Sequence, residues 1–492
     1  MPARARTPVR LTIVGLRKQA LSGAKWISGA TAITASLQFI QIALLARLLV
    51  PEDFGLMALT MIVIGFAQAY ADMGVSSAIV HRQDATGQQL SSLFWLNILV
   101  GFGVFVVMLA VAPLLADLYE EPRLAGLIAL AAAVFLIAPA GQQFSMLIQK
   151  ALRFDALAVI DVSSTAVGFA TSVVLAFNDQ GVYSLVWGQL ANAATRSLML
   201  LRLGIRDWRP ALRFRGGDLA GYLRFGAFQM GERTINFLGA NLDKILIGSL
   251  VGVHALGIYN VAYQLVMKPM QLFNPIITRV AFPLFAMVQT DDARLRAGYL
   301  DAIRVIALVL FPVYVWMILL AEPLTLLVLG QGWNSAVTTV QILGVLAMFY
   351  SLGNPLGSLL LAKGRVEIGF YLNIWRVVLF AAAIWMGVRW GVEGVAAALV
   401  LATAFGMFPV GFWIRRLLVG MRPLEYVSAF WPMLATAMVM CMSLLLIRSY
   451  GPEFNNRVVE LVVLTVAGAV VYLAIILPWQ RPFFLRLRNV FR

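Results

Sequence analysis

Charged side chains interrupt several long apolar stretches of this sequence, and their types suggest ligand binding. Seven cations and four acids lie inside stretches long enough to cross a membrane, which leaves a balance of +3. A charge near the centre of a bilayer costs about 2.5–3.5 kcal/mol, so most of these groups must line a water-filled cavity, pair with one another or reach the interface. A cationic cavity favours an anionic ligand such as a phosphate, a pyrophosphate or an acidic sugar.

Polar residues follow one side of two of these stretches, 219–249 and 254–288. At 100° per residue, the polar positions of each stretch fall on one arc of a helix. Long, flexible cations are poor packing residues, so we expect these arcs to face a cavity. Polar packing between helices is the alternative, above all for the glutamines of the stretch 24–46. The residues that we expect to contact the ligand are Arg233, Lys268, Arg279, Lys244, Asn236, Gln264, Gln271, Arg376, Gln38 and Gln41.

Acidic residues among these cations are candidates for binding a coupling ion. A carboxylate in the cavity could take up a proton or a sodium ion, and it could neutralise a cation once the ligand has left. Asp243 is the first candidate because it lies on the polar arc of 219–249. A fixed ion pair with a neighbouring helix is the alternative for this residue. The candidates are Asp243, Glu232, Asp72 and Asp161.

The sequence contains no arrangement of residues that is typical of an active site. Its two histidines, His81 and His254, lie at the ends of apolar stretches, and its single cysteine, Cys441, lies within one. A Walker-type phosphate loop is absent, so ATP is not the direct energy source. Glu52 and Asp53 stand where a helix is expected to begin, which favours a role in capping that helix. We therefore predict no enzyme, no cofactor and no bound metal.

The elements that carry these residues are predicted to be membrane-spanning helices. Hydrophobic residues make up 61% of the 492 residues and charged residues 12%, a composition that excludes soluble enzymes and disordered proteins. A spanning helix needs about 20 mostly apolar residues. By this criterion we predict an all-α polytopic membrane protein with about fourteen spans. They lie near 24–46, 54–80, 89–115, 123–149, 155–177, 182–201, 219–249, 254–288, 297–320, 335–362, 367–388, 392–413, 425–447 and 457–478.

The distribution of Lys and Arg predicts the orientation of these spans. With the N-terminus in the cytoplasm, the inside segments hold 26 of the 38 basic residues and the outside loops hold five. Both termini are therefore expected in the cytoplasm. Topology then explains the net charge of +15, which argues against a nucleic-acid partner. The apolar stretch after the basic N-terminal region is too long for a signal peptide, so we expect it to remain in the membrane.

An internal repeat divides the expected spans into two halves. LLVPEDFGLM at 48–57 aligns with LVGVHALGIY at 250–259, and two further short matches follow in the same order at offsets of 213 and 210. Such parallel repeats commonly enclose a central cavity. We therefore predict two pseudo-symmetric six-helix lobes around a central cavity, plus two C-terminal helices. The boundaries are 1–23 for a basic cytoplasmic arm, 24–201 for the N-lobe, 202–218 for a basic cytoplasmic linker, 219–413 for the C-lobe, 425–478 for the last two spans and 479–492 for a basic cytoplasmic tail.

Three segments resemble the polysaccharide transport branch (Wzx-like flippases) of the multidrug/oligosaccharidyl-lipid/polysaccharide (MOP) exporter superfamily. They are LLARLLVPEDFGLMAL (44–59), NLDKILIGSLVGVHALGIYNVAYQL (241–265) and LGNPLGSLLLAKGR (352–365). The similarity runs from about residue 20 to 480 and is strongest to colanic-acid and O-antigen exporters. These motifs identify the branch and not the sugar. The resemblance also implies cationic cavity residues, for which Arg233, Lys268 and Arg279 are the nearest matches.

The resemblance implies that the protein moves a lipid-linked sugar across a bacterial inner membrane. The expected substrate is an undecaprenyl-pyrophosphate-linked oligosaccharide, moved by alternating access for exopolysaccharide, capsule or O-antigen biosynthesis. Further expected partners are the lipid bilayer, a coupling proton or sodium ion, and polymerase or chain-length proteins of the same pathway. A flippase of peptidoglycan precursors and a multidrug antiporter of the same fold are alternatives, and the +3 balance argues against the antiporter. A membrane polymerase or ligase of lipid-linked sugars would need a long outside loop with catalytic Arg or His, and none is present.

Overall fold

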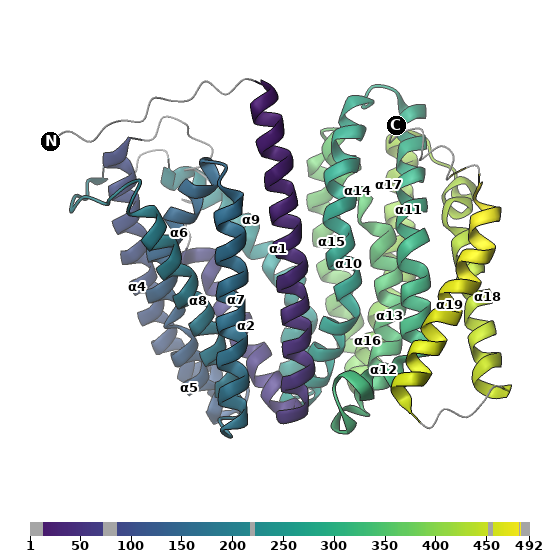
Figure 1. The fold of residues 1–492 in the computed structure, drawn as a ribbon, viewed down its shortest axis with the longest axis horizontal. Coiled ribbons are helices and arrows are strands. Elements are labelled where there is room, and N and C mark those ends of the chain that lie inside the picture. The colour runs from purple at the N-terminus through teal and green to yellow at the C-terminus, as the bar shows by residue number, and fades with distance from the viewer. Residues whose placement is uncertain (1–12, 72–85, 217–221, 451–455, 482, 484–492) are drawn as a thin grey trace. The chain divides into compact units, whose positions relative to one another are not determined.

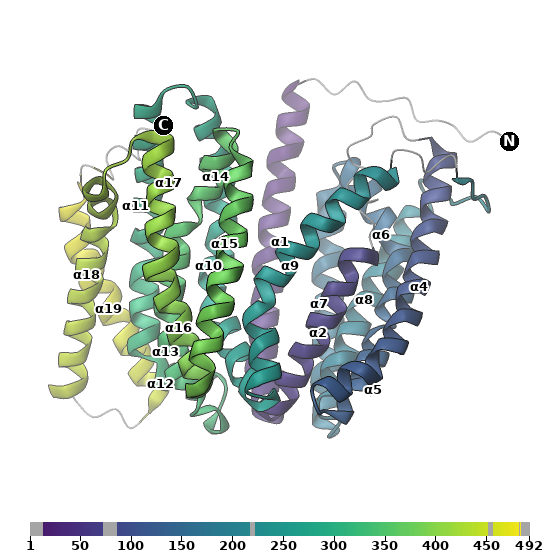
Figure 2. The same cartoon turned by 180° about the vertical axis from the view of Figure 1, so that it is seen from behind.

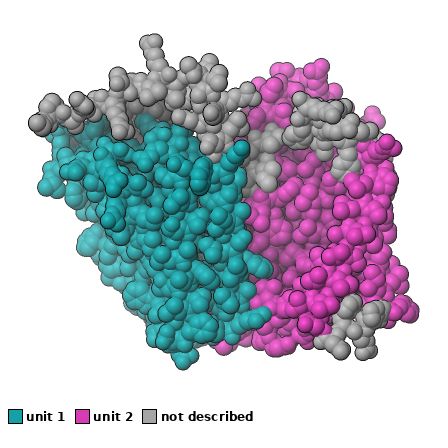
Figure 3. Space-filling model, in the orientation of Figure 1, with its two compact units in different colours: residues 1–48, 60–237 teal, residues 49–59, 238–492 magenta. Residues whose placement is uncertain are grey.

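The structure is a computed structural model that describes residues 13–71, 86–216, 222–450, 456–481 and 483. These residues form α-helices joined by short turns, with brief 3₁₀ and π segments and no strand, which confirms the predicted all-α class (Figures 1 and 2). Two compact units divide the chain (Figure 3). Unit 1 comprises Met1–Leu48 and Thr60–Phe237, and unit 2 comprises Leu49–Leu59 and Leu238–Arg492.

Unit 1 is a bundle of long helices. α7 packs against both α1 and α8, α8 also packs against α6, and α4 packs against α5 and α6 (Figure 1). Glycines permit the closest approach of α7 to α8, because a Cβ added to Gly168 or to Gly188 would lie 2.8 Å from the carbonyl oxygen of the other. The helices of unit 1 are α1 (Ile13–Leu48), most of α2 (Pro51–Ala71), α4 (Gly87–Leu118), α5 (Pro122–Ala131), α6 (Val134–Lys150), α7 (Phe154–Phe177), α8 (Tyr183–Gly204) and the first part of α9 (Tyr222–Leu250).

Unit 2 is a second helical bundle, built around α10, α11 and α13. α16 packs on α13, and α18 packs on both α11 and α19 (Figure 2). A π segment, Ala402–Met407, joins α16 to α17. The helices of unit 2, besides the ends of α2 and α9 that it includes, are α10 (Val253–Met287), α11 (Asp292–Leu319), α12 (Ala321–Val328), α13 (Ala336–Gly353), α14 (Pro355–Ala362), α15 (Val366–Gly387), α16 (Gly391–Leu401), α17 (Phe408–Val419), α18 (Pro423–Tyr450) and α19 (Arg457–Trp479).

Ten helical stretches of the described chain are long and apolar enough to cross a membrane, so the protein is a multi-pass membrane protein. Three helices at expected spans, α8, α9 and α10, do not meet the same requirement for high hydropathy and low charge. The reason in α9 and α10 is the set of polar residues that the sequence analysis assigned to a cavity. The single stretch Val366–Val419 covers most of two expected spans, 367–388 and 392–413. The number of fourteen spans therefore stays a prediction.

The first turns of α2 and α10 pack against each other through equivalent positions of the internal repeat. In the repeat alignment Gly55 corresponds to Gly257 and Pro51 to Val253, both pairs being 202 residues apart. A Cβ added to Gly55 would lie 2.0 Å from the carbonyl oxygen of Val253, and one added to Gly257 would lie 1.8 Å from that of Pro51. The contact is reciprocal, and both glycines are required for it.

The acidic residues at the start of α2 have separate roles. Asp53 is buried, and its Oδ2 accepts a hydrogen bond from the backbone N–H of Val50 at 3.4 Å, as expected for a residue that caps the N-terminus of a helix. Glu52 instead pairs with His254, which occupies the equivalent position in the repeat; Oε1 and Nδ1 lie 2.6 Å apart. This pair lies beside the reciprocal glycine contact and joins α2 to α10.

Candidate functional site

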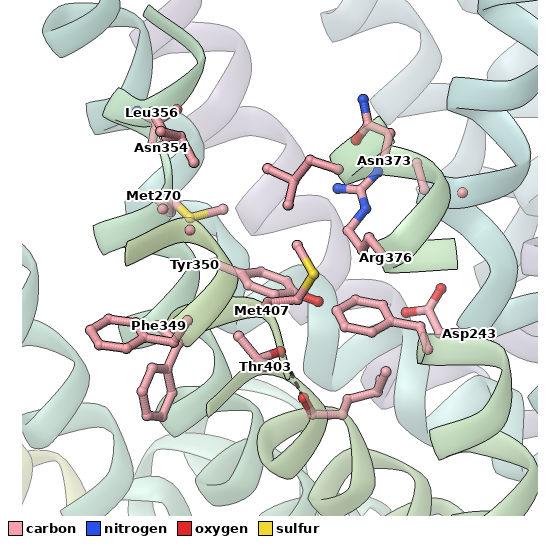
Figure 4. A pocket seen from close by; sticks show the side chains of 18 of the residues that line it. Asp243, Met270, Phe349, Tyr350, Asn354, Leu356, Asn373, Arg376, Thr403 and Met407 are labelled. Atoms are coloured by element: carbon pink, nitrogen blue, oxygen red, sulfur yellow. Dashed lines mark hydrogen bonds between the residues drawn. The ribbon is translucent and has the colours of Figure 1, made fainter. Parts of the chain in front are cut away.

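Unit 2 contains a cavity of about 430 Å³ that is lined by residues of α9, α10, α13, α15 and α17, among others (Figure 4). Its charged residues are Asp243 on α9, Arg376 on α15 and Arg415 on α17. Two cations and one acid give the lining a charge of +1. The structure thus brings together Asp243 and Arg376, two of the residues that the sequence analysis assigned to a cavity.

A tyrosine of α10 holds the carboxylate of Asp243 in place. The hydroxyl of Tyr259, a fully buried residue, donates to Oδ2 of Asp243 at 2.6 Å. The next residue, Lys244, is directed elsewhere on the helix surface, and its Nζ lies 4.9 Å from the centroid of the Tyr263 ring. Tyr263 itself lines the cavity. Asp243 and Lys244 therefore contact different tyrosines of α10 and do not act as one pair.

Arg376 projects from the middle of α15 beside the cavity. Its Nε is buried without a hydrogen-bond partner, and no ion pair of Arg376 is formed within the described part of the chain. α9 approaches it closely, because a Cβ added to Gly239 would lie 3.6 Å from the terminal nitrogen Nη2 of Arg376. Figure 4 shows Asn373 and Arg376 on the same helix, one turn apart. Arg376 is thus a cation in a membrane helix that forms no ion pair with the described residues, although Asp243 lines the same cavity.

Two amides around the same cavity also have unused hydrogen-bonding groups. Oδ1 of Asn274 and Nδ2 of Asn354 are buried and have no partner among the described residues. Buried polar groups in native proteins nearly always have a partner, which is often a water or a ligand. Three such atoms around one cavity, the third being Nε of Arg376, indicate a space suited to a polar ligand. The lining offers donors from Arg376 and Asn354 and an acceptor from Asn274.

Arg415 differs from Arg376, because other residues of the protein accept its hydrogen bonds. It is only 2% exposed, its Nε donates to the hydroxyl of Tyr299 at 2.6 Å, and its Nη2 donates to the carbonyl oxygen of Leu352 at 3.4 Å. The guanidinium carbon lies 4.7 Å from the centroid of the Tyr426 ring, a distance typical of a cation–π contact. These contacts join α11, α13, α17 and α18. Arg415 therefore builds a wall of the cavity.

Unit 1 contains a second group of polar residues, around Asp161 of α7. A nitrogen of Arg196 on α8 lies 3.1 Å from Oδ1 of Asp161. Both side chains line a cavity of about 300 Å³ together with Thr31 and Thr34 of α1. The hydroxyls of these threonines donate to carbonyl oxygens of their own helix. Asp161, a candidate for ion coupling, thus has a cationic partner within unit 1.

Gln38 and Gln41 of α1 are in different environments. Nε2 of Gln41 donates to Oγ of Ser172 on α7 at 3.1 Å, so this glutamine joins two packed helices, as in the alternative role considered for it. Gln38 is exposed. Among the coupling candidates, Asp72 lies outside the described residues.

The other residues of the expected binding set whose side chains the structure describes do not line the cavity of unit 2. Arg233 and Asn236 lie on the part of α9 that belongs to unit 1, where Arg233 is partly buried and Asn236 is exposed. On α10, Lys268 and Gln264 are partly buried and Gln271 is exposed. The side chains of Glu232 and Arg279 lie outside the described part of the structure.

Sequence reasoning missed several polar residues of the cavity lining. Asn354 and Asn373 are amides within the expected spans 335–362 and 367–388. A polar amide inside an apolar span is a candidate for a cavity lining, so the sequence contained a signal for both. Arg415 was missed because the twelfth span was expected to end at residue 413, whereas α17 continues to Val419. The helix boundary thus decided whether this arginine counted as a loop residue or a membrane residue.

Comparison with solved structures defines the class of fold. The structure of the lipid II flippase MurJ in an inward closed conformation matches with a TM-score of 0.75, covering 93% of this chain and 99% of that chain at 14% sequence identity. This likeness confirms the expected all-α polytopic fold.

Comparison of sequences defines the family. Residues 44–338 match the family model described as polysaccharide biosynthesis protein. The lipopolysaccharide biosynthesis protein WzxC of Escherichia coli K12 is 34% identical over 85% of both chains, and the teichuronic acid biosynthesis protein TuaB of Bacillus subtilis 168 is 33% identical over 93% of this chain and 95% of its own. The protein belongs to this polysaccharide biosynthesis family. The resemblance drawn from the three sequence segments is thereby confirmed.

Proposed function

We propose that this protein moves a lipid-linked oligosaccharide from one leaflet of the bacterial inner membrane to the other by alternating access. The observation that carries the proposal is the cavity of unit 2, where Arg376 forms no ion pair with the described residues and its Nε has no hydrogen-bond partner. Membership of a polysaccharide biosynthesis family supports a sugar as cargo. The fold shared with a lipid II flippase supports movement of a lipid-linked molecule. The function needs no covalent step.

The chemistry of the cavity suits an undecaprenyl-pyrophosphate-linked oligosaccharide. Moving a bare pyrophosphate through an apolar layer would cost many kcal/mol, because its charges would lose their hydration. The guanidinium of Arg376 offers a planar set of donors that matches phosphate oxygens, and the amide of Asn354 adds a further donor. The acceptor on Asn274 suits a sugar hydroxyl. A carboxylate-bearing sugar would use the same donors.

The charge distribution supports an orientation with both termini and the segment between α8 and α9 in the cytoplasm. In this orientation the substrate is loaded where cytoplasmic enzymes assemble it and is released toward the polymerase and chain-length proteins of the same pathway.

Removal of the protein is expected to stop polymer synthesis and to trap the lipid-linked repeat unit in the cytoplasmic leaflet. The measurement is the fraction of labelled repeat unit that a membrane-impermeant enzyme can reach in spheroplasts, with and without the protein. Restoration by the wild-type gene is the control. An unchanged accessible fraction in cells that lack the protein would show that it does not move this substrate.

We further propose that Asp243 couples transport to a proton or sodium gradient. Its carboxylate lies on the same cavity as Arg376 and is held by a hydroxyl, so ion binding would change the charge that the substrate meets. Asp243→Asn is expected to lose gradient dependence in reconstituted vesicles and to keep some downhill flipping. Tyr259→Phe, which removes the hydroxyl and keeps the carboxylate, is the matched control and should remain gradient-dependent. If wild-type protein ignores both gradients, Asp243 has no coupling role.

A further inference from the structure

The segment that follows α8 is fastened onto unit 1. We call residues 205–216 the strap. Trp208 of the strap packs against two aromatic residues of the bundle, with ring centroids 6.3 Å from Phe94 and 5.8 Å from Phe144. Phe94 and Phe144 are both buried. The strap therefore begins with an anchor in the core of unit 1.

Hydrogen bonds to the first turns of α4 continue this attachment. The backbone N–H of Ala211 donates to Oγ of Ser91 at 3.1 Å, and the carbonyl oxygen of Ala211 accepts from Nε1 of Trp95 at 2.8 Å. The backbone N–H of Arg215 donates to Oγ of Ser92 at 3.2 Å. Three bonds over five residues fix the course of the strap along α4.

The strap and α4 together form a groove of about 570 Å³. The α4 residues of the groove are spaced as one helical stripe, and the strap adds Leu212 and Phe214, which are 92% and 51% exposed. Side chains as apolar as these are unfavourable in water at such exposure. The groove is lined by Trp95, Ile98, Leu99, Phe102, Leu212, Arg213 and Phe214.

Positive charge lies beside this apolar groove. The strap contains four arginines and one aspartate, a net charge of +3. Arg213 is the cation that lines the groove, and its Nε is buried without a partner among the described residues. Arg209 and Arg215 are exposed. An apolar groove with an arginine in its lining matches a molecule with a hydrocarbon chain and an anionic head.

We propose that the groove binds an acidic phospholipid of the cytoplasmic leaflet. One acyl chain lies along the stripe of α4, covering Leu212 and Phe214, and the phosphate accepts hydrogen bonds from Arg213. Basic residues next to a membrane helix attract acidic lipids, and tryptophan favours the depth of the headgroups. The site is separate from the cavity of unit 2, and its leaflet depends on the proposed orientation. The bound lipid would fix the strap between α8 and α9.

The test is lipid binding to the purified, delipidated protein, measured by native mass spectrometry with added phosphatidylglycerol. Wild type should retain phosphatidylglycerol in preference to phosphatidylcholine. Arg213→Gln is expected to weaken retention of phosphatidylglycerol at least about tenfold, the effect of losing one charged hydrogen bond to the phosphate. Leu212→Ser combined with Phe214→Ser should weaken retention of both lipids. Arg209→Gln, a variant of the same strap outside the groove lining, is the matched control and should change retention less than twofold, as a rough limit set by a screened surface charge.

Three outcomes would overturn the proposal. Equal losses in the Arg209 and Arg213 variants would indicate only diffuse attraction to the basic strap. Displacement of phosphatidylglycerol by a lower concentration of polyprenyl phosphate would assign the groove to the carrier lipid of a substrate. Arg209→Cys combined with Cys441→Ala leaves one thiol in the chain, and this thiol should react with an impermeant reagent only from the cytoplasm. Reaction from the other side would show that the strap does not lie on the cytoplasmic side, which contradicts binding of a lipid of the cytoplasmic leaflet. None of these measurements requires transport, so they remain valid if the proposed function fails.

Discussion

Replacing Gly257 by alanine is expected to prevent normal accumulation of the protein. The added methyl group would lie 1.8 Å from the carbonyl oxygen of Pro51, so the first turns of α2 and α10 would have to separate. Overpacking typically costs about 1–3 kcal/mol, and contact with a backbone atom that cannot rotate away puts this case at or above the upper end. Gly55→Ala should have a similar effect, because its methyl group would lie 2.0 Å from the carbonyl oxygen of Val253.

The measurement is the amount of folded protein in the membrane and its thermal unfolding in detergent. Gly357→Ala is the matched control, since this glycine of α14 has open space where the Cβ would stand, and helix propensity then favours alanine by up to about 1 kcal/mol. The double variant of Gly55 and Gly257 should lose less stability than the two single variants lose together, because the first methyl group already separates the helices. Normal accumulation of either single variant would show that the reciprocal contact does not hold α2 on α10.

Replacing Arg376 by glutamine is expected to lower transport at least about tenfold, the effect of losing one charged hydrogen bond to a ligand, while the protein accumulates normally. Arg376 makes no ion pair within the described residues and its Nε has no partner, so Arg376→Gln breaks no ion pair and no hydrogen bond of that nitrogen. Arg376→Lys keeps the charge but loses the planar set of donors, and an intermediate rate is expected. The measurement is the flipping rate per molecule of protein in vesicles.

Arg415 provides the contrasting control for Arg376. It bonds Tyr299 and Leu352 and packs on Tyr426, so Arg415→Gln should lower the free energy of unfolding by about 3 kcal/mol. Accumulation should fall before transport per molecule does. If Arg376→Gln transports at the wild-type rate, or if it fails to accumulate as Arg415→Gln does, then Arg376 is not a substrate-binding residue.

Much of the fold could be predicted from the sequence, because hydropathy and helix signals act locally. The stretch 89–115 was expected as a span and α4 covers Gly87–Leu118; the stretch 457–478 was expected and α19 covers Arg457–Trp479. A repeat was visible at 48–57 and 250–259, but its reciprocal packing was not. Hydropathy carries no information about which carbonyl oxygen a glycine faces.

The candidate site could be predicted only in part. A helical arc predicts which side of its helix a residue occupies, but it does not predict which residue of another helix it contacts. Asp243 and Arg376 both line the cavity of unit 2, whereas the hydroxyl that holds Asp243 comes from Tyr259, sixteen residues further along the chain. Gln41 looked equally suited to a cavity, and its bond to Ser172 depends on the packing of α7 against α1. Such pairings between helices follow from tertiary structure.

The most direct test of the account is flipping of a purified undecaprenyl-pyrophosphate-linked oligosaccharide in vesicles that contain the purified protein. An impermeant reagent that modifies the sugar reports the molecules in the outer leaflet, and molecules that reach it from the inner leaflet react only if they have been flipped. Wild-type vesicles are expected to expose their inner-leaflet substrate, and vesicles with Arg376→Gln are expected to expose it much more slowly at equal protein content. Vesicles with wild-type protein that react no further than protein-free vesicles would contradict the account.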